Sequence, residues 1–182
     1  MGMVAPTYYT ADMVRALPED GNKYEVVHGE LLVTPSPRPL HELVQIRLLA
    51  GLHQYLESNP VGVVLGPKGD ISWGPDILVQ PDVFVVTLAE ARALRWEQMK
   101  TLLLVVEVLS PSTSRYDRFT KRRLFQEVGV ALYWIVDCDA QQVEIWTPNA
   151  RFPVLERERL AWHPAGATDP FEIELERVFR AL

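Results

Sequence analysis

Two acidic residues lie in segments that are otherwise almost wholly apolar. Glu107 lies within Leu102–Leu109, where every other residue is Leu or Val, and Asp82 lies within Val79–Val86, directly after Pro81. An ionised carboxylate in such a strand is costly unless a cation or hydrogen bonds compensate for its burial. If both side chains point to one face of a sheet, their hard oxygen atoms form a ready site for a divalent cation.

Each acid also has a simpler interpretation. Glu107 could lie at a strand end, where it reaches solvent or pairs with a basic side chain. Asp82 could belong to a turn that precedes a strand, because Pro81 cannot donate to a sheet ladder and marks a strand start, an edge or a bulge. A bulge can also direct a side chain toward a functional site. The metal-site interpretation therefore depends on the two acids lying together.

Lys121 is the third candidate, on a helix predicted over Asp117–Val128. It precedes Leu124 and Phe125 by three and four residues, so it shares their apolar face. An ammonium group on that face could orient a water nucleophile or stabilise charge on a phosphate. Alternatively, Lys121 reaches solvent from the helix edge, or pairs only with Asp117 one turn earlier.

The elements that must position these residues are those of an α/β fold. Apolar residues recur every four positions from Leu40 to Leu56, which predicts a long helix ending before Pro60. Strands are expected at Val61–Leu65, Ile77–Val86, Leu102–Leu109 and Ala131–Val136, with a further extended piece at Ile71–Trp73 in the loop after the first of them. With the helix over Asp117–Val128, the order is α-β-β-β-α-β, which predicts a mixed central sheet flanked by helices.

Further elements are expected on either side of this core. Lys23–Val27 and Glu30–Thr34 flank His28-Gly29, which indicates an N-terminal β-hairpin. A short helix is expected to begin near Thr10. The C-terminal additions are a strand at Gln142–Trp146, a strand at Val154–Arg157 and a helix near Leu175–Leu182. We find no repeat and no low-complexity linker, and expect one domain over residues 1–182.

Composition limits the class of protein. The net charge of −6 and the pI of about 5.2 argue against a passive nucleic-acid binder, which normally has a basic surface. They do not exclude a nuclease, because clustered carboxylates lower the net charge and bound cations offset them locally. Cys138 has no partner for an internal disulfide, and no apolar run is long enough to span a bilayer. We expect a cytoplasmic protein without a membrane partner.

Several short motifs occur in a specific order along the chain. They are Tyr24–Leu31, Ser36-Pro37 with His41, Pro81-Asp82-Val83, Val106–Thr113, Asp117 with Lys121, and Tyr133–Asp137. With this ordered set, the chain from about Tyr9 to Leu182 resembles the Uma-type restriction endonuclease family. That family is a branch of the PD-(D/E)XK nuclease superfamily, so the resemblance implies a restriction-endonuclease-like core.

The resemblance also implies roles for particular residues. Asp82 and Glu107 would be the ligands of Mg²⁺ or Mn²⁺, and the backbone carbonyl of Val108 would be a further ligand. The lysine that usually follows the glutamate by two residues is replaced by Leu109. The family pattern uses a lysine from the following helix instead, which matches Lys121.

Three more residues are candidates for the same site. Glu25 and Glu30 resemble the acidic positions of the family's hairpin, and we expect Glu30 to be the third carboxylate unless it is only a solvated hairpin acid. His41, in the first turn of the long helix, could touch phosphate or a metal-bound water, or be only a helix-edge side chain. Ser110 could hydrogen-bond to the site or simply end the strand.

The function expected is metal-assisted hydrolysis of phosphodiester bonds in a nucleic acid, with DNA as the expected substrate. A homodimer is expected, because cutting both strands of a duplex normally takes two active sites. One alternative is a degenerate nuclease fold that serves in binding or assembly, which the negative net charge favours. Another is a glycosidase with Asp82 and Glu107 as an acid–base pair, although no aromatic sugar platform is evident near either acid.

Overall fold

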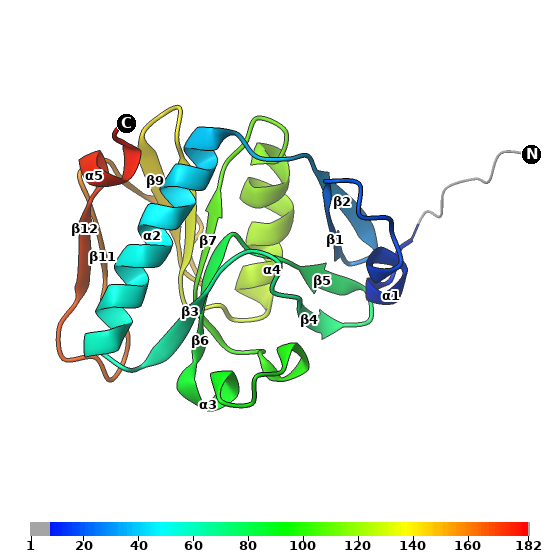
Figure 1. The fold of residues 1–182 in the computed structure, drawn as a ribbon, viewed down its shortest axis with the longest axis horizontal. Helices are drawn as coiled ribbons and strands as arrows, with labels where there is room; N and C mark the ends of the chain where they lie inside the picture. The colour runs from blue at the N-terminus through cyan, green and yellow to red at the C-terminus, as the bar shows by residue number, and fades with distance from the viewer. Residues whose placement is uncertain (1–7, 182) are drawn as a thin grey trace, which may run out of the picture.

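A six-stranded mixed sheet forms the centre of the computed structural model, which describes residues 8–181 (Figure 1). Its strands, in spatial order, are β10 (Val154–Glu156), β9 (Gln142–Trp146), β8 (Tyr133–Asp137), β7 (Leu102–Val108), β6 (Val83–Thr87) and β3 (Gly62–Leu65). All neighbours are antiparallel except β7 and β8, which are parallel. The predicted mixed central sheet is therefore confirmed.

The parallel pair β7–β8 needs a crossover, and a helical segment supplies it. This segment was expected to be one α-helix, but it begins as the π-helix η2 (Tyr116–Lys121) and continues as α4 (Arg122–Glu127). Gly129, with a φ of 78°, follows the helix in the left-handed conformation that commonly ends helices. The π-helical part carries both Asp117 and Lys121, whose side chains are buried.

One face of the main sheet is covered by α2 (Pro39–Ser58) and by the C-terminal elements (Figure 1). The predicted helical stripe is buried at Val44, Leu48, Leu52 and Leu56. The hairpin of β11 (Arg159–Trp162) and β12 (Phe171–Glu174), and the short α5 (Leu175–Phe179), pack against the same core. The expected final helix is therefore shorter than predicted, and Leu182 lies outside the described residues.

The other face is covered by α4 and by a second, four-stranded sheet. The strands of this small sheet are β2 (Glu30–Thr34), β1 (Lys23–Val27), β5 (Ile77–Val79) and β4 (Ile71–Gly74). The predicted N-terminal hairpin is confirmed with its boundaries. The helix α1 (Ala11–Arg15) is capped by the Thr10 hydroxyl and packs beside β1 and β5. Two further short helices, α3 (Leu88–Ala91) and η1 (Trp96–Gln98), follow β6.

The prediction of one continuous strand over Ile77–Val86 is wrong. The segment forms β5 in the small sheet and β6 in the main sheet, and the chain passes between the sheets at Gln80–Asp82. Pro81 has no N–H to donate, and the Gln80 N–H donates to the Glu25 side chain at 2.7 Å rather than to a strand. Asp82 therefore lies where the two sheets adjoin.

Among residues 8–181, no helix is both long enough and apolar enough to cross a membrane.

Candidate active site

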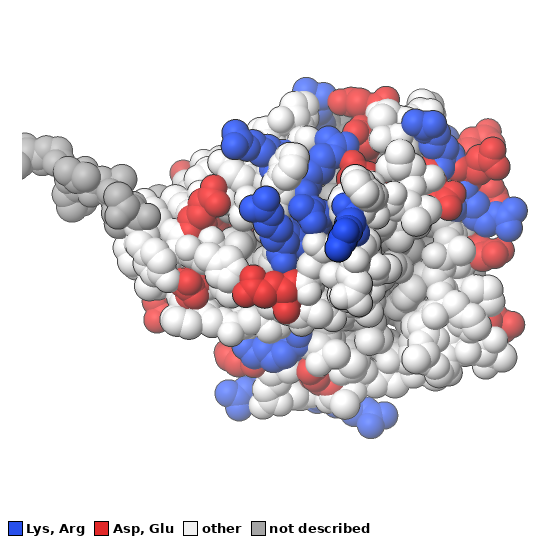
Figure 2. Space-filling model, turned by 180° about the vertical axis from the view of Figure 1, so that it is seen from behind, with Lys and Arg blue, Asp and Glu red and all other residues white. Residues whose placement is uncertain are grey.

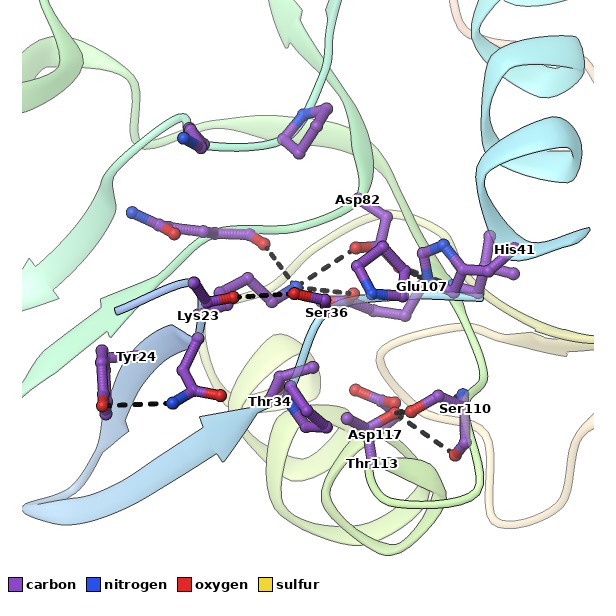
Figure 3. A pocket seen from close by; sticks show the side chains of 18 of the residues that line it. Lys23, Tyr24, Thr34, Ser36, His41, Asp82, Glu107, Ser110, Thr113 and Asp117 are labelled. Atoms are coloured by element: carbon purple, nitrogen blue, oxygen red, sulfur yellow. Dashed lines mark hydrogen bonds and ion pairs between the residues drawn. The ribbon is translucent and has the colours of Figure 1, made fainter. Parts of the chain in front are cut away.

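Four carboxylates and two lysines meet where the two sheets adjoin. The carboxylate cluster consists of Glu25 on β1, Asp82 before β6, Glu107 on β7 and Asp117 on η2. All four residues are buried, with exposed fractions of 0% to 6%. A cavity of about 850 Å³ opens onto Asp82, Glu107 and Asp117 (Figure 3), whereas Glu25 does not line it. Residues far apart in the sequence thus form one recessed polar site.

Asp82 is fixed by contacts from three different elements. Its Oδ2 accepts a hydrogen bond from the backbone N–H of Val108 at 2.9 Å, which places it beside the end of β7. The same oxygen lies 3.2 Å from His41 Nε2, and Oδ1 lies 3.2 Å from Lys23 Nζ. The buried side chain of Gln45, one turn after His41 on α2, donates to the Asp82 carbonyl at 3.1 Å.

Lys121 lies among the other three carboxylates. Its ammonium donates to Glu107 Oε1 at 2.9 Å, and it pairs with Glu25 Oε2 at 2.7 Å and Asp117 Oδ1 at 3.5 Å. The prediction that Lys121 faces the sheet agrees with this position. Within the described residues, however, it makes no ion pair with Asp82, whose partner is a different lysine.

That lysine is Lys23, at the start of β1. Its ammonium lies 3.2 Å from Asp82 Oδ1, and 4.0 Å from both Glu107 Oε2 and Glu25 Oε2. It also donates to the Gln80 carbonyl at 3.1 Å, and Figure 3 shows it reaching between Asp82 and Glu107. The sequence interpretation missed Lys23. Alternation along the strand could have found it, because residues 23 and 25 share one face of β1.

The buried charges affect one another strongly. Burial raises the pKa of the Glu107 carboxyl well above its usual range; Lys121 opposes this shift and Asp82 adds to it. Burial alone would also raise the pKa of Asp82, but Lys23 and His41 outweigh it and hold that pKa far below its usual range. In the metal-free site, Asp82 is therefore the firmly ionised acid, whereas Glu107 holds a proton more tightly.

Four further acids and bases respond to the same surroundings. Burial raises the pKa of Asp117, although Lys121 and Lys23 oppose it. For Glu25, the two lysines outweigh burial and lower the pKa. Burial disfavours the charge of Lys121, but Glu107 and Glu25 reverse this effect and raise its pKa well above the usual range. Burial likewise disfavours the charge of Lys23, but Asp82 and Glu25 raise its pKa above the usual range, so both lysines are cationic.

The remaining predicted residues separate into two groups. His41, Val108 and Ser110 line the cavity, so the structure brings them to the site. Glu30 is exposed at the far end of the hairpin from Lys23 and does not line the cavity, so the expectation that it is the third carboxylate is wrong. Glu25 takes that place, because the hairpin turns its side chain inward to Lys121 and the Gln80 N–H.

The chemistry of the site fits a hard divalent cation. Carboxylate oxygens are the ligands that Mg²⁺ and Mn²⁺ prefer. Asp117 Oδ1 is buried and accepts no hydrogen bond, so the site holds more acceptor oxygens than its donors satisfy. As arranged, no three His, Cys, Asp or Glu side chains within residues 8–181 form a group ready to hold a metal ion. Asp82 and Glu107 are the acids that would hold it.

A mixed-sheet core with one acid directly before β6 and another on the neighbouring β7 defines a protein with the restriction-endonuclease-like nuclease fold. A model of the Uma2 family, described as "Putative restriction endonuclease", matches residues 11–171. The chain belongs to this family.

One solved structure shares the fold over nearly the whole chain. It is described as a "putative nuclease belonging to DUF820" from Anabaena variabilis ATCC 29413. The two chains are 21% identical, with a TM-score of 0.76, and the match covers 94% of this chain and 97% of the other. A search of curated proteins gave no match.

Proposed function

We propose that this protein is an endodeoxyribonuclease that uses Mg²⁺ or Mn²⁺ to hydrolyse phosphodiester bonds. The observation that carries the proposal is the pairing of Asp82 and Glu107. The hydrogen bond from the Val108 N–H to Asp82 holds the two carboxylates beside each other, and both face the same cavity. Membership of a restriction endonuclease family supports a nuclease over other uses of such a pair.

In the proposed reaction, different residues would bind the cation, offset charge and contact the phosphate. Asp82 and Glu107 would hold the cation, and the Val108 carbonyl is a further candidate ligand. When bound, such a cation supplies Lewis-acid polarisation of the scissile phosphate and lowers the pKa of water. Lys121 keeps Glu107 in place and offsets its charge, since its ammonium lies 2.9 Å from Oε1. His41 orients Asp82 and faces the cavity, where it could contact a phosphate oxygen.

A nucleic-acid substrate must approach a protein of net charge −6. Figure 2 shows a group of Lys and Arg side chains near the middle of the face opposite to that of Figure 1, with acidic side chains and further basic side chains around it. Such a local positive region supplies the phosphate contacts that bring a polyanion to the surface. The overall charge therefore does not oppose the proposal.

The test is a cleavage assay on duplex DNA, single-stranded DNA and RNA, with Mg²⁺, with Mn²⁺ and with EDTA. We expect cleavage of DNA with either metal and none with EDTA. Asp82→Asn should abolish it, because the variant loses one of two ligands for the cation. Glu30→Gln is the matched control, since this carboxylate is exposed and outside the cavity. Metal-dependent cleavage that survives Asp82→Asn would overturn the proposal.

The second candidate is a nuclease fold that binds or assembles without cutting. The observation that favours it is the ion-pair network itself, because Lys23 and Lys121 already satisfy much of the carboxylate charge. A degenerate module would bind nucleic acid equally well in Mn²⁺ and EDTA, and would cut nothing in the same assay.

We also propose a homodimer, because cleavage of both DNA strands needs two sites. The outer strands of the main sheet are β10 and β3. On β10, Val154 and Leu155 are 59% and 51% exposed, so this edge offers both unpaired backbone and apolar side chains. Sedimentation should find a dimer at micromolar concentration, and a monomer at high micromolar concentration would contradict it.

A further inference from the structure

The oxygens of Asp82 and Glu107 are not equally engaged. Asp82 Oδ2 is held by the Val108 N–H and His41, and Glu107 Oε1 is held by Lys121. The two oxygens left over are Asp82 Oδ1 and Glu107 Oε2, one from each expected ligand. Both face the ammonium of Lys23, at 3.2 Å and 4.0 Å.

The surroundings of that ammonium are those of a cation site. Four oxygens from three parts of the chain surround it: those of Asp82, Glu107 and Glu25 and the Gln80 carbonyl. A divalent cation binds carboxylate oxygens at about 2.0–2.6 Å, so a metal shared by Asp82 and Glu107 would lie against the Lys23 nitrogen. Two cations at that distance repel each other in a buried site.

Of the two lysines, Lys23 is the one that can leave. Its side chain is 21% exposed, whereas that of Lys121 is only 3% exposed and is enclosed by three carboxylates. Lys23 lines the cavity from the first position of β1, and its ammonium is on a flexible four-carbon stem. An ammonium that swings into the cavity regains water, so its displacement does not leave a buried charge unpaired.

We propose that the Lys23 ammonium fills the cation site of the metal-free protein and that a divalent metal must displace it to bind. The inference rests on the proposed metal-dependent function. Lys23 is then a positioning residue: before the metal arrives it holds Asp82 Oδ1 and Glu107 Oε2 around one point, and it lowers the apparent affinity for that metal.

Calorimetry with Mn²⁺ on the full chain tests this competition. Lys23→Met should bind Mn²⁺ about tenfold more tightly than wild type or better, because the competing charge is gone. Lys23→Arg, which keeps the charge, should bind no more tightly than wild type. Lys68→Met is the matched control, since Lys68 lines the same cavity and forms no ion pair with the carboxylate cluster. It should leave the affinity unchanged.

Thermal unfolding distinguishes competition from a merely structural role. Without metal, Lys23→Met should have a lower Tm than wild type, because Asp82 loses its partner. Saturating Mn²⁺ should raise the Tm of Lys23→Met by more than it raises that of wild type, because tighter binding stabilises more. A lysine that only supports the fold would lower the Tm and leave the Mn²⁺ affinity unchanged or weaker.

A measurement on wild type covers the case in which the variant does not fold. Acetylation of lysines, followed by peptide mass spectrometry, reports how freely each ammonium meets the reagent. Mn²⁺ should accelerate acetylation of Lys23 relative to Lys68 in the same sample, because displacement moves it into the cavity. An unchanged or slower rate would overturn the inference.

The outcomes separate the two proposals. Equal Mn²⁺ affinity in wild type and Lys23→Met, with cleavage intact, would overturn the displacement of Lys23 and leave the metal-dependent nuclease standing. Absence of Mn²⁺ binding in both proteins would overturn both.

Discussion

Lys121 offsets the charge of more carboxylates than its position in the sequence indicates. From the helical periodicity alone, it is one lysine on an apolar face, and its loss would be expected to affect chemistry more than stability. The structure places its ammonium within 3.5 Å of three buried carboxylates from three different elements. Removal of one partner from a buried ion pair leaves the other charges uncompensated, which is more costly than losing an exposed pair.

We therefore expect Lys121→Ala to lower the free energy of unfolding by about 3–5 kcal/mol, in addition to any loss of cleavage. Arg123→Ala, on the same helix but exposed, should change it by less than about 0.5 kcal/mol. Urea denaturation in EDTA measures both variants. Equal stability of Lys121→Ala and wild type would show that the ion pairs of Lys121 do not form in solution.

Glu25 and Glu30 form a second matched pair at the residue scale. They lie on paired strands of one hairpin, but Glu25 is fully buried against Lys121 and Glu30 is exposed. Glu25→Gln should reduce cleavage by about 10²-fold, because Lys121 and Lys23 lose a charge that holds them in place. Glu30→Gln should cleave like wild type. Equal activities of the two variants would contradict the assignment of Glu25 to the site.

At the scale of elements, the close approach of β3 to β6 depends on Gly62. A Cβ atom at this position would lie 2.5 Å from the Val86 carbonyl oxygen and 2.8 Å from Val85 Cγ1. The first of these neighbours is backbone, so it cannot move without displacing β6. Because β6 continues directly from Asp82, a shift of this strand also disturbs the site.

Gly62→Ala should accordingly destabilise the fold by about 1–3 kcal/mol. Gly51→Ala is the control within α2, where the new Cβ would meet Phe171 and Ile173 at an ordinary 3.5 Å. It should stabilise by up to about 1 kcal/mol, because alanine favours a helix interior over glycine. Thermal unfolding of the two variants gives the comparison, and a stable Gly62→Ala protein would mean that β3 moves freely.

The elements that were predicted correctly have local causes. The hairpin of β1 and β2 follows from two apolar-rich runs around His28-Gly29, and α2 follows from a four-residue repeat within one helix. The division of Ile77–Val86 between two sheets has a distant cause, since Glu25 captures the Gln80 N–H from 55 residues away. The π-helical turn of η2 likewise has no periodic signal in the sequence.

The residues of the site likewise divide into those that the sequence predicts and those that depend on tertiary contacts. Asp82, Glu107 and Lys121 could be predicted because a charge among apolar neighbours is conspicuous in the sequence. Lys23 could not be found by that rule, because it begins a strand directly after the turn residues Gly21 and Asn22 and is not surrounded by apolar neighbours. The choice between Glu25 and Glu30 depends on which face of the hairpin meets β5, and that is a tertiary contact.

At the scale of the whole molecule, the main sheet separates two apolar cores. The carboxylate cluster lies at one end of this sheet, against the small sheet, and its burial follows from the packing of the large elements around it. The charge state of the cluster is therefore coupled to global folding. In metal-free protein, this coupling makes stability depend on pH in a range where exposed carboxylates no longer titrate.

The direction of this dependence follows from the shifted pKa values. Burial raises the pKa of Glu107 and of Asp117 above their ordinary values of 4.5 and 3.8, so the folded protein binds these protons more tightly than the unfolded chain does. The stability that these two protons contribute is fully present at a pH below the ordinary pKa values. It is lost as the pH rises through the raised pKa values of the folded protein. Asp82 and Glu25 have lowered pKa values, so they contribute stability above their ordinary pKa values. They lose this contribution to stability as the pH falls toward their lowered pKa values.

We therefore expect the free energy of unfolding of the metal-free protein to fall as pH rises from about 4.5 through the raised pKa of Glu107. Urea denaturation in EDTA at a series of pH values measures the slope. Glu107→Gln cannot lose a proton, so its slope should be smaller, and the difference between the two curves isolates Glu107 from all other titrating groups. Asp117→Asn added to Glu107→Gln should flatten the curve further. Parallel curves for wild type and Glu107→Gln would show that Glu107 is ionised in the folded, metal-free protein, held by Lys121 and Lys23 against the cost of its burial.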